Sequence, residues 1–331
     1  MVADFFCTEK YEVAPIALAL NESFTAIALA FGNVRPVLGA YHTFQNLTQA
    51  VPPGSSPLLQ LPYFTPEVVK SVEGEDAKTH LTIQKYMKMS EEQRRSLTVG
   101  AGLLSEKEYE TAISVAKQIP ALEVSKAFFK VMGEKVITPS SLVQLVVKAR
   151  FIPPGSTNVP EVNELDLEDI DPDEDDIDAL LGRRPAKNRR GKDTDGQKAE
   201  DKEEAVLPPL AYAPYLASDR PPRWHIFLAD ARQGKIAVPP FTFTTFNKPI
   251  FDENGKPTFN MQTLKMQFQA PPAVGDFTFV LHIICDGYLG FDTKMEITLH
   301  VDDPAKAAAL EEDDISEPDE GRYYPKTRPA F

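Results

Sequence analysis

The chain has 331 residues, of which 42% are hydrophobic and 25% are charged, and its formal net charge is −14. These proportions are typical of a globular protein with room for two or three domains, and the acidic balance argues against a nucleic-acid surface. The only cysteines are Cys7 and Cys285, so the sequence has no disulfide framework, and a reducing compartment is the default expectation.

Helical periodicity begins near the N-terminus. The large apolar residues of the first predicted helix lie three or four positions apart: Ile16, Leu20, Phe24, Ile27 and Phe31. Gly32 is expected to end this helix, and a second helix follows Pro36. Asn21 and Glu22 interrupt the apolar stretch, which is shorter than the roughly 20 residues of a membrane helix. Without a signal peptide either, the chain is predicted to be soluble.

The next stretch, SPLLQLPYF at 56–64, is bracketed by prolines and is too apolar for a solvated loop. We predict an extended peptide whose leucines pack on the helices. Helices are then expected after Thr65-Pro66, over about 75–89, and after two capping boxes that begin at Ser90 and Ser105. Residues 1–119 are therefore predicted to form an all-α helical bundle with a helix-turn-helix region.

The glycines at 100 and 102 separate the last two predicted helices. Such a turn is also compatible with a helix-hairpin-helix that binds the DNA backbone. The acidic surroundings favour a structural turn instead.

The hydrophobic period then changes from 3.6 to 2, which indicates strands. Alternating apolar residues occupy 143–151, 224–228, 264–268, 277–285 and 295–301, with a hairpin partner at 122–131 and weaker strands at 235–238 and 242–246. We predict an α+β multidomain protein. Its all-β part, residues 120–152 and 208–303, is a fibronectin type III-like sandwich, because Cys285 has no cysteine mate around the core Trp224.

Residues 153–207 show no apolar periodicity, and we predict a long disordered insertion in the sandwich. Its acidic block, 161–178, has eleven carboxylates and no basic residue, and the basic segment 183–190 follows it. That segment is either a nuclear localisation signal or a local balance for the acidic charge. An acidic tail, 304–331, ends the chain. In this tail Ser316 has acidic residues at the next and third positions, as acid-directed kinases require, and is a candidate phosphorylation site.

Nothing in the sequence indicates catalysis. The five histidines are scattered, and no zinc-ligand spacing or phosphate loop occurs. His282 and His300 are expected to point outward from strands as solvated imidazoles. The acidic run at 169–175 fails the calcium-loop pattern because it lacks the central glycine and the final glutamate. We therefore predict no enzyme activity and no catalytic, cofactor-binding or metal-binding residues.

The order of these parts resembles the Brl module, with LLQLP at 58–62 and Asp286-Gly287-Tyr288-Leu289-Gly290 as the most specific segments. This module is shared by the Sec-sixty-three subunit of the endoplasmic-reticulum protein translocon and by cassettes of spliceosomal helicases. The translocon subunit is the closer match, because the sequence has no ATPase motor but has an acidic insertion and tail. The resemblance covers 1–303, without the lumenal J-domain and its His-Pro-Asp triplet.

The resemblance implies a non-enzymatic scaffold that engages the protein-conducting channel from the cytosolic face of the endoplasmic reticulum in post-translational translocation. The acidic tail is expected to bind a basic segment of the Sec-sixty-two subunit. Membrane anchoring would come from segments outside this sequence. A helicase-associated module that regulates RNA remodelling and a generic cytosolic adaptor remain the alternatives.

The channel contact is predicted at one end of the sandwich. Two short turns, which contain Glu134-Lys135 and Pro271-Pro272, lose little conformational entropy on binding. A channel loop that faces ribosomes is expected to be basic, which favours Glu134 as a contact. We expect the insertion to leave from the other end, beside the loop 286–291, and to hinder docking there.

Overall fold

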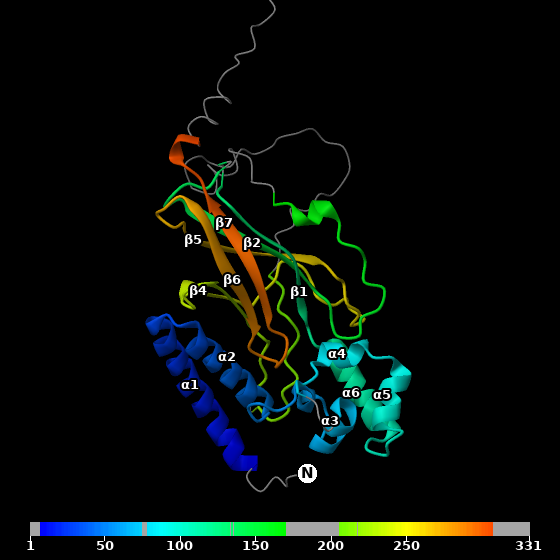
Figure 1. Ribbon diagram of the computed structural model, residues 1–331. Helices are drawn as coiled ribbons and strands as arrows, with labels where there is room; N and C mark the ends of the chain where they lie inside the picture. The colour runs from blue at the N-terminus through cyan, green and yellow to red at the C-terminus, as the bar shows by residue number, and fades with distance from the viewer. Residues whose placement is uncertain are drawn as a thin grey trace, which may run out of the picture.

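The computed structural model describes residues 7–74, 78–132, 134, 136–169, 205–216 and 218–306. The helices in these ranges are α1 (Cys7–Phe31), α2 (Val34–Gln49), η1 (Pro57–Gln60), α3 (Pro66–Glu73), α4 (Ile83–Lys88), α5 (Glu91–Thr98), α6 (Glu106–Gln118) and η2 (Glu164–Leu167), where η marks a 3-10 helix. The strands are β1 (Leu122–Lys130), β2 (Leu142–Phe151), β3 (Trp224–Asp230), β4 (Ile236–Phe243), β5 (Met261–Gln269), β6 (Gly275–Cys285) and β7 (Thr293–Val301). A helical region thus precedes antiparallel strands, as the predicted α+β class requires (Figure 1).

The strands form two sheets, one in the order β1-β2-β5 and the other in the order β4-β3-β6-β7. The alternating residues of β2 and β3 face each other in one core, where Leu145, Val147, Trp224 and Leu228 are almost completely buried. The two weaker strands expected at 235–238 and 242–246 are replaced by the single strand β4, which ends at Phe243. Its prolines are tolerated because β4 lies at a sheet edge. The fibronectin type III-like classification and the proposed domain boundaries stay predictions.

The outer face of the four-stranded sheet is covered by α2, which packs through Val37 and Tyr41 against Phe227 and Ile284, and by α1, which lies beside α2 and adds Ala28 to the same cluster (Figure 1). His282 lies on this face, is 7% exposed, and stacks on Phe227 with ring centroids 4.8 Å apart. The expectation of a solvated His282 was therefore wrong, since a strand position that points away from one core can point into another. The unbroken burial of 224–229 shows the same two-sided packing.

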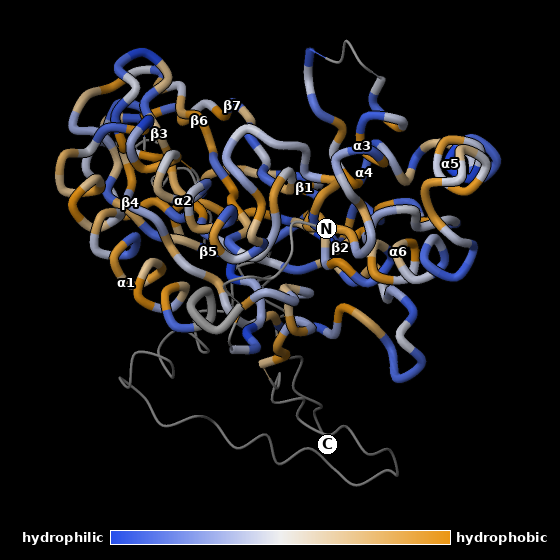
Figure 2. Tube along the Cα trace, turned by 90° about the horizontal axis from the view of Figure 1, so that it is seen from below, coloured by the Kyte–Doolittle hydropathy of each residue, from blue (hydrophilic) through white to orange (hydrophobic). Residues whose placement is uncertain are grey.

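The free face of α1 carries a stripe of exposed apolar side chains. Figure 2 shows the hydrophobic residues of this helix as orange segments of the tube. The exposed fractions range from 50% to 75% for Val13, Ile16, Leu20, Phe24, Ile27 and Phe31. Residues 12–31 of this helix are long and apolar enough to cross a membrane by length and composition, and 17% of the window is buried. The sequence reasoning therefore underestimated the length of this apolar segment. The helix starts well before Ile16, and it continues through Asn21 and Glu22.

The start signals predicted for the later helices are confirmed. Thr65 caps α3, and Ser90 and Ser105 form complete capping boxes at the starts of α5 and α6. The helix expected over 75–89 is reduced to α4, which begins only after Thr82. A Cβ atom at Gly100 would lie 2.8 Å from the Ser96 carbonyl oxygen, so the turn between α5 and α6 requires glycine for close packing.

The peptide at 56–64 is not extended, because its centre forms the 3-10 helix η1 with Ser56 as N-cap. Leu58 and Leu61 are buried as expected, at 0% and 2% exposure. Gln60 bonds to both backbone groups of Leu289, accepting from its N–H at 2.7 Å and donating to its carbonyl at 3.0 Å. The peptide therefore connects the helices to the loop after β6, and the two most specific segments of the sequence lie in contact.

The predicted disorder of 153–207 is not confirmed, because residues 153–169 have a described course, while 170–204 lie outside the described residues. Arg150 donates to the Pro160 carbonyl at 2.7 Å, and Lys130 donates to the Asp169 carbonyl at 3.1 Å. The segment therefore leaves beside the helices and runs back to the last residue of β1. The insertion leaves beside the loop 286–291, as expected, since Ile152 lines one pocket with Gly290 and Phe291. The expected crowding of that end is wrong for residues 161–169, which run back to the end of β1.

Candidate protein-binding surface

The two predicted contact loops lie at the same end of the sheets, which we call the loop end. The β1–β2 connection contains Glu134, which is exposed and pairs through its backbone with Val131. The β5–β6 connection contains Pro271, which is half-buried, and Pro272, which is exposed. Lys135 and Ser316 lie outside the described residues, so their roles stay predictions.

Backbone hydrogen bonds hold the loop end together. Ser140 donates its N–H to the Pro271 carbonyl at 3.3 Å, which joins the two loops directly. Ala270 N–H donates to the Ser141 carbonyl at 2.9 Å, and Asp302 N–H donates to the Ile137 carbonyl at 2.7 Å. Because the loops are fixed to each other and to the end of β7, a partner that binds here would order little additional chain.

Three exposed apolar side chains also lie in or beside these loops, and the sequence reasoning missed them. Met132 is 43% exposed, Leu142 is 60% exposed and Val274 is 56% exposed. Leu142 directly precedes the buried Val143, so the alternation of β2 already implied that it points outward. Exposed apolar groups beside polar ones are a common feature of protein-binding surfaces.

The same end carries an exposed charge cluster. His300 Nδ1 lies 2.5 Å from Asp276 Oδ1, and its Nε2 lies 3.3 Å from Asp302 Oδ1. The hydrogen bond to Asp276, together with the charge of Asp302, raises the pKa of His300 above its usual value. The hydrogen bond from Lys306 lowers the pKa of Asp302, so this carboxylate remains ionised near neutral pH.

We expect His300 and His282 to titrate on opposite sides of their common reference pKa of 6.5. Burial under the helices, and then the charge of Lys294, lower the pKa of His282. The raised pKa of His300 adds stability that is complete below the unfolded-state pKa and is lost as the pH rises through the folded-state value. The lowered pKa of His282 has the opposite effect on stability. The folded state loses stability as the pH falls, because the buried imidazole resists protonation.

Proton NMR titration of the imidazole resonances, assigned with His300→Gln and His282→Gln variants, measures both values. Two titrations on the same side of the reference value would contradict the packing described for His282.

The loop at the other end, 286–291, is not available as an alternative docking surface, because helices and the 205–223 segment cover it. Tyr288 is 2% exposed, and its hydroxyl accepts a hydrogen bond from the Tyr212 N–H at 2.8 Å. Gln49 donates to the Gly287 carbonyl at 2.6 Å. This loop is therefore the joint between the helices and the sheets, and the loop end is the exposed one of the two.

A buried carboxylate stabilises this joint. Asp286 is 1% exposed; its Oδ2 lies 2.8 Å from Arg220 Nη2 and 2.6 Å from Arg223 Nε, and its Oδ1 accepts the Arg223 N–H at 2.8 Å. Burial acts to raise the pKa of Asp286, but contact with His225 and the two arginine charges lower it below its usual value. The carboxylate is thus ionised and paired, as a structural ion pair requires.

Within the described ranges no group of three or more histidine, cysteine, aspartate or glutamate residues could hold a metal ion. Most of the acidic run at 169–175 lies outside them. The loop end offers hydrogen-bonded loops, exposed apolar side chains and surface charges, a combination that is common at protein-binding surfaces.

Comparison with known proteins finds no family model that matches the chain. The chain is similar to the "translocation protein sec63" of Schizosaccharomyces pombe, with 28% identity over 284 residues, which cover 84% of the chain and 41% of that protein. It is also similar to the "protein translocation protein SEC63" of Saccharomyces cerevisiae, with 25% identity over 325 residues, which cover 89% of the chain and 44% of that protein. The similarity supports the SEC63 family, while the chain spans less than half the length of these curated relatives.

Proposed function

We propose that the chain is the cytosolic part of a SEC63-type translocon subunit, a scaffold without catalytic activity. It would engage the protein-conducting channel from the cytosolic side in post-translational translocation into the endoplasmic reticulum. The observation that carries this proposal is the similarity, along most of the chain, to two proteins named for translocation. The alternative of a helicase-associated module is not favoured, because neither relative bears such a name.

The Brl module assignment belongs to the same proposal. Its support is the contact between the LLQLP peptide and the loop after β6, through Gln60 and Leu289. This contact gives both segments a structural role, since together they connect the helical region to the sheets.

Further parts of the proposal concern location and partners. The exposed apolar stripe of α1 supports a position at the cytosolic face of the membrane. The acidic tail is proposed to bind a basic segment of the Sec-sixty-two subunit through salt-sensitive attraction, with Ser316 as a phosphorylation site that adds negative charge.

The loop end is proposed as the channel contact, with Glu134, Lys135, Pro271 and Pro272 as binding residues. We expect the double substitution Glu134→Arg with Pro272→Ser to weaken association with the channel about ten-fold, because it reverses a charge and loosens a stiff loop at a fixed surface. The measurement is co-purification of the tagged full-length protein with the channel from detergent-solubilised membranes.

The matched control is Glu110→Arg, which reverses the same charge at an exposed position of α6, away from the loop end. The unfolding midpoint of both variants should remain near that of the wild type, since surface substitutions usually change stability by less than about 0.5 kcal/mol. Normal channel recovery with the double variant, or equal losses with the control, would contradict the loop end as the contact.

A further inference from the structure

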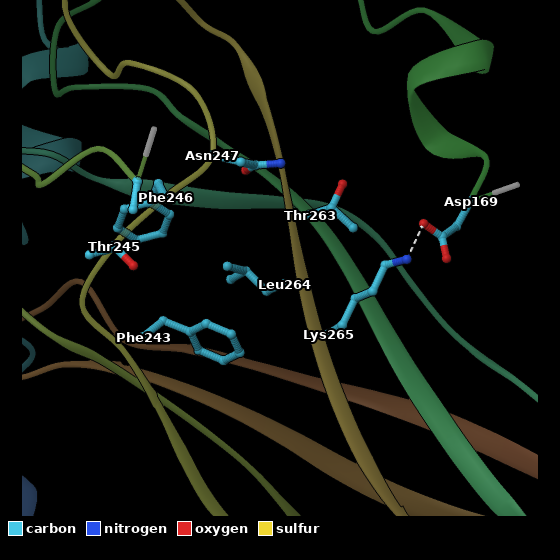
Figure 3. Close-up of a pocket in the computed structure, with 9 residues that line it drawn as sticks. Asp169, Phe243, Thr245, Phe246, Asn247, Thr263, Leu264 and Lys265 are labelled. Atoms are coloured by element: carbon cyan, nitrogen blue, oxygen red, sulfur yellow. Dashed lines mark ion pairs between the residues drawn. The ribbon is translucent and has the colours of Figure 1, made fainter. Parts of the chain in front are cut away.

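Three lysines of the three-stranded sheet converge on one carboxylate of the insertion. Lys130 ends β1, Lys148 lies in β2 and Lys265 lies in β5. The Asp169 carboxylate is 2.5 Å from Lys130 Nζ, 2.7 Å from Lys265 Nζ and 4.0 Å from Lys148 Nζ (Figure 3 shows the pair with Lys265). We call these three lysines and Asp169 the carboxylate clamp.

The cationic half of the clamp is built into the sheet. Lys148 is 6% exposed, and its ammonium group donates to Thr263 Oγ1 at 2.9 Å. Thr263 is its cross-strand partner, so the hydrogen bond follows from the register of β2 and β5. Burial lowers the pKa of Lys148, and the charge of Asp169 opposes that effect. A lysine held this deeply needs an anion beside it, whichever chain supplies the anion.

The anionic half is attached mainly through Asp169 itself. No residue of η2 is buried, and Leu165 is 72% exposed. The described segment 161–169 is mostly exposed. Just before it, Arg150 donates a hydrogen bond to the Pro160 carbonyl. The Asp169 side chain itself is 9% exposed, so the segment is held mainly at this one carboxylate. An acidic peptide that offers the lysines an equivalent carboxylate can take its place, while the lysines remain on the sheet.

A pocket of about 540 Å³ lies beside the clamp (Figure 3). Asp169 and Lys265 stand on one side of it, and Phe243, Phe246 and Leu264 provide apolar lining. An acidic residue at the clamp would therefore have room beside it for a neighbouring side chain.

We propose that the sheet face carrying Lys130, Lys148 and Lys265 is a binding site for an acidic peptide of a partner protein, and that Asp169 of the chain's own insertion occupies this site. The argument is charge complementarity between a fixed cationic site and an acidic segment that is mostly exposed apart from Asp169. The insertion then acts as an internal competitor, and the partner's carboxylates replace Asp169 when they bind. This site adjoins the loop end at Lys130 but includes none of the proposed channel-contact residues.

The test uses the full chain and a fluorescein-labelled oligoglutamate peptide, with binding followed by fluorescence anisotropy at low ionic strength. Asp169→Asn should tighten binding about five-fold, because it removes the internal competitor but keeps the shape of the side chain. Adding Lys148→Met and Lys265→Met to Asp169→Asn should abolish that gain. The matched control, Lys294→Met on β7 of the other sheet, should leave the gain intact. Thermal unfolding of each variant establishes that it is folded.

Three results would overturn the proposal: no tighter binding with Asp169→Asn, a gain that survives loss of Lys148 and Lys265, or a gain that added salt does not reduce. The second result would place the peptide on another basic segment. If the lysine variant does not fold, Lys265→Met alone decides, because this lysine is 41% exposed and can be replaced without opening the core.

Discussion

Replacing Asp286 by asparagine is expected to lower the free energy of unfolding by about 3–5 kcal/mol, the usual cost of removing one partner from a buried ion pair. Asp286 is 1% exposed and contacts the side chains of both Arg220 and Arg223. An asparagine has a similar shape but cannot balance the arginine charges, which would remain within the joint between helices and sheets. Urea unfolding near neutral pH measures the loss.

The matched control is Glu22→Gln. Glu22 pairs with the same Arg223 at 3.3 Å, but its side chain is 57% exposed, so its removal should cost less than about 1 kcal/mol. The lowered pKa of Asp286 also determines how stability depends on pH. The stability that the ion pair adds is present above the unfolded-state pKa of Asp286 and is lost as the pH falls through its folded-state pKa. The difference between wild type and variant should thus shrink in acid. Similar losses for both variants near neutral pH would show that burial of the ion pair is unimportant.

Replacing Leu58 by alanine is expected to lower the free energy of unfolding by about 2–5 kcal/mol. The side chain is 0% exposed and belongs to the core cluster that includes Phe64, Val68 and Ile83. The cavity left by its removal cannot collapse easily, because hydrogen bonds hold the peptide at Ser56, which donates to Glu73, and at Gln60, which donates to Leu289. The loss is measured by urea or thermal unfolding.

Leu59→Ala is the control, because it removes the same atoms from the next residue of the same 3-10 helix. Leu59 is only partly buried, so the expected loss is smaller, below about 2 kcal/mol. If Leu59→Ala costs as much as Leu58→Ala, the peptide does not dock through the face described here.

The sequence predicted the elements whose signals are local. Capping boxes at Ser90 and Ser105 depend on residues three positions apart, and the alternation in 143–151 depends on neighbours in one strand. Both kinds of signal follow directly from helix and strand geometry. The turns with Glu134 and Pro272 were also expected to be exposed, since they separate predicted strands, and both residues are exposed.

Contacts between distant segments were decided by the tertiary structure. Gln60 and Leu289 are 229 positions apart, and nothing in either segment by itself specifies the other as its partner. His282 became buried only because α1 and α2 cover its sheet, and Asp169 gained its lysines only because three strands bring them to one face. Local periodicity determines which side chains share a face, whereas the packing of elements determines what each face meets. The joint and the carboxylate clamp belong to the second kind, and this is why composition alone did not predict the described course of residues 153–169.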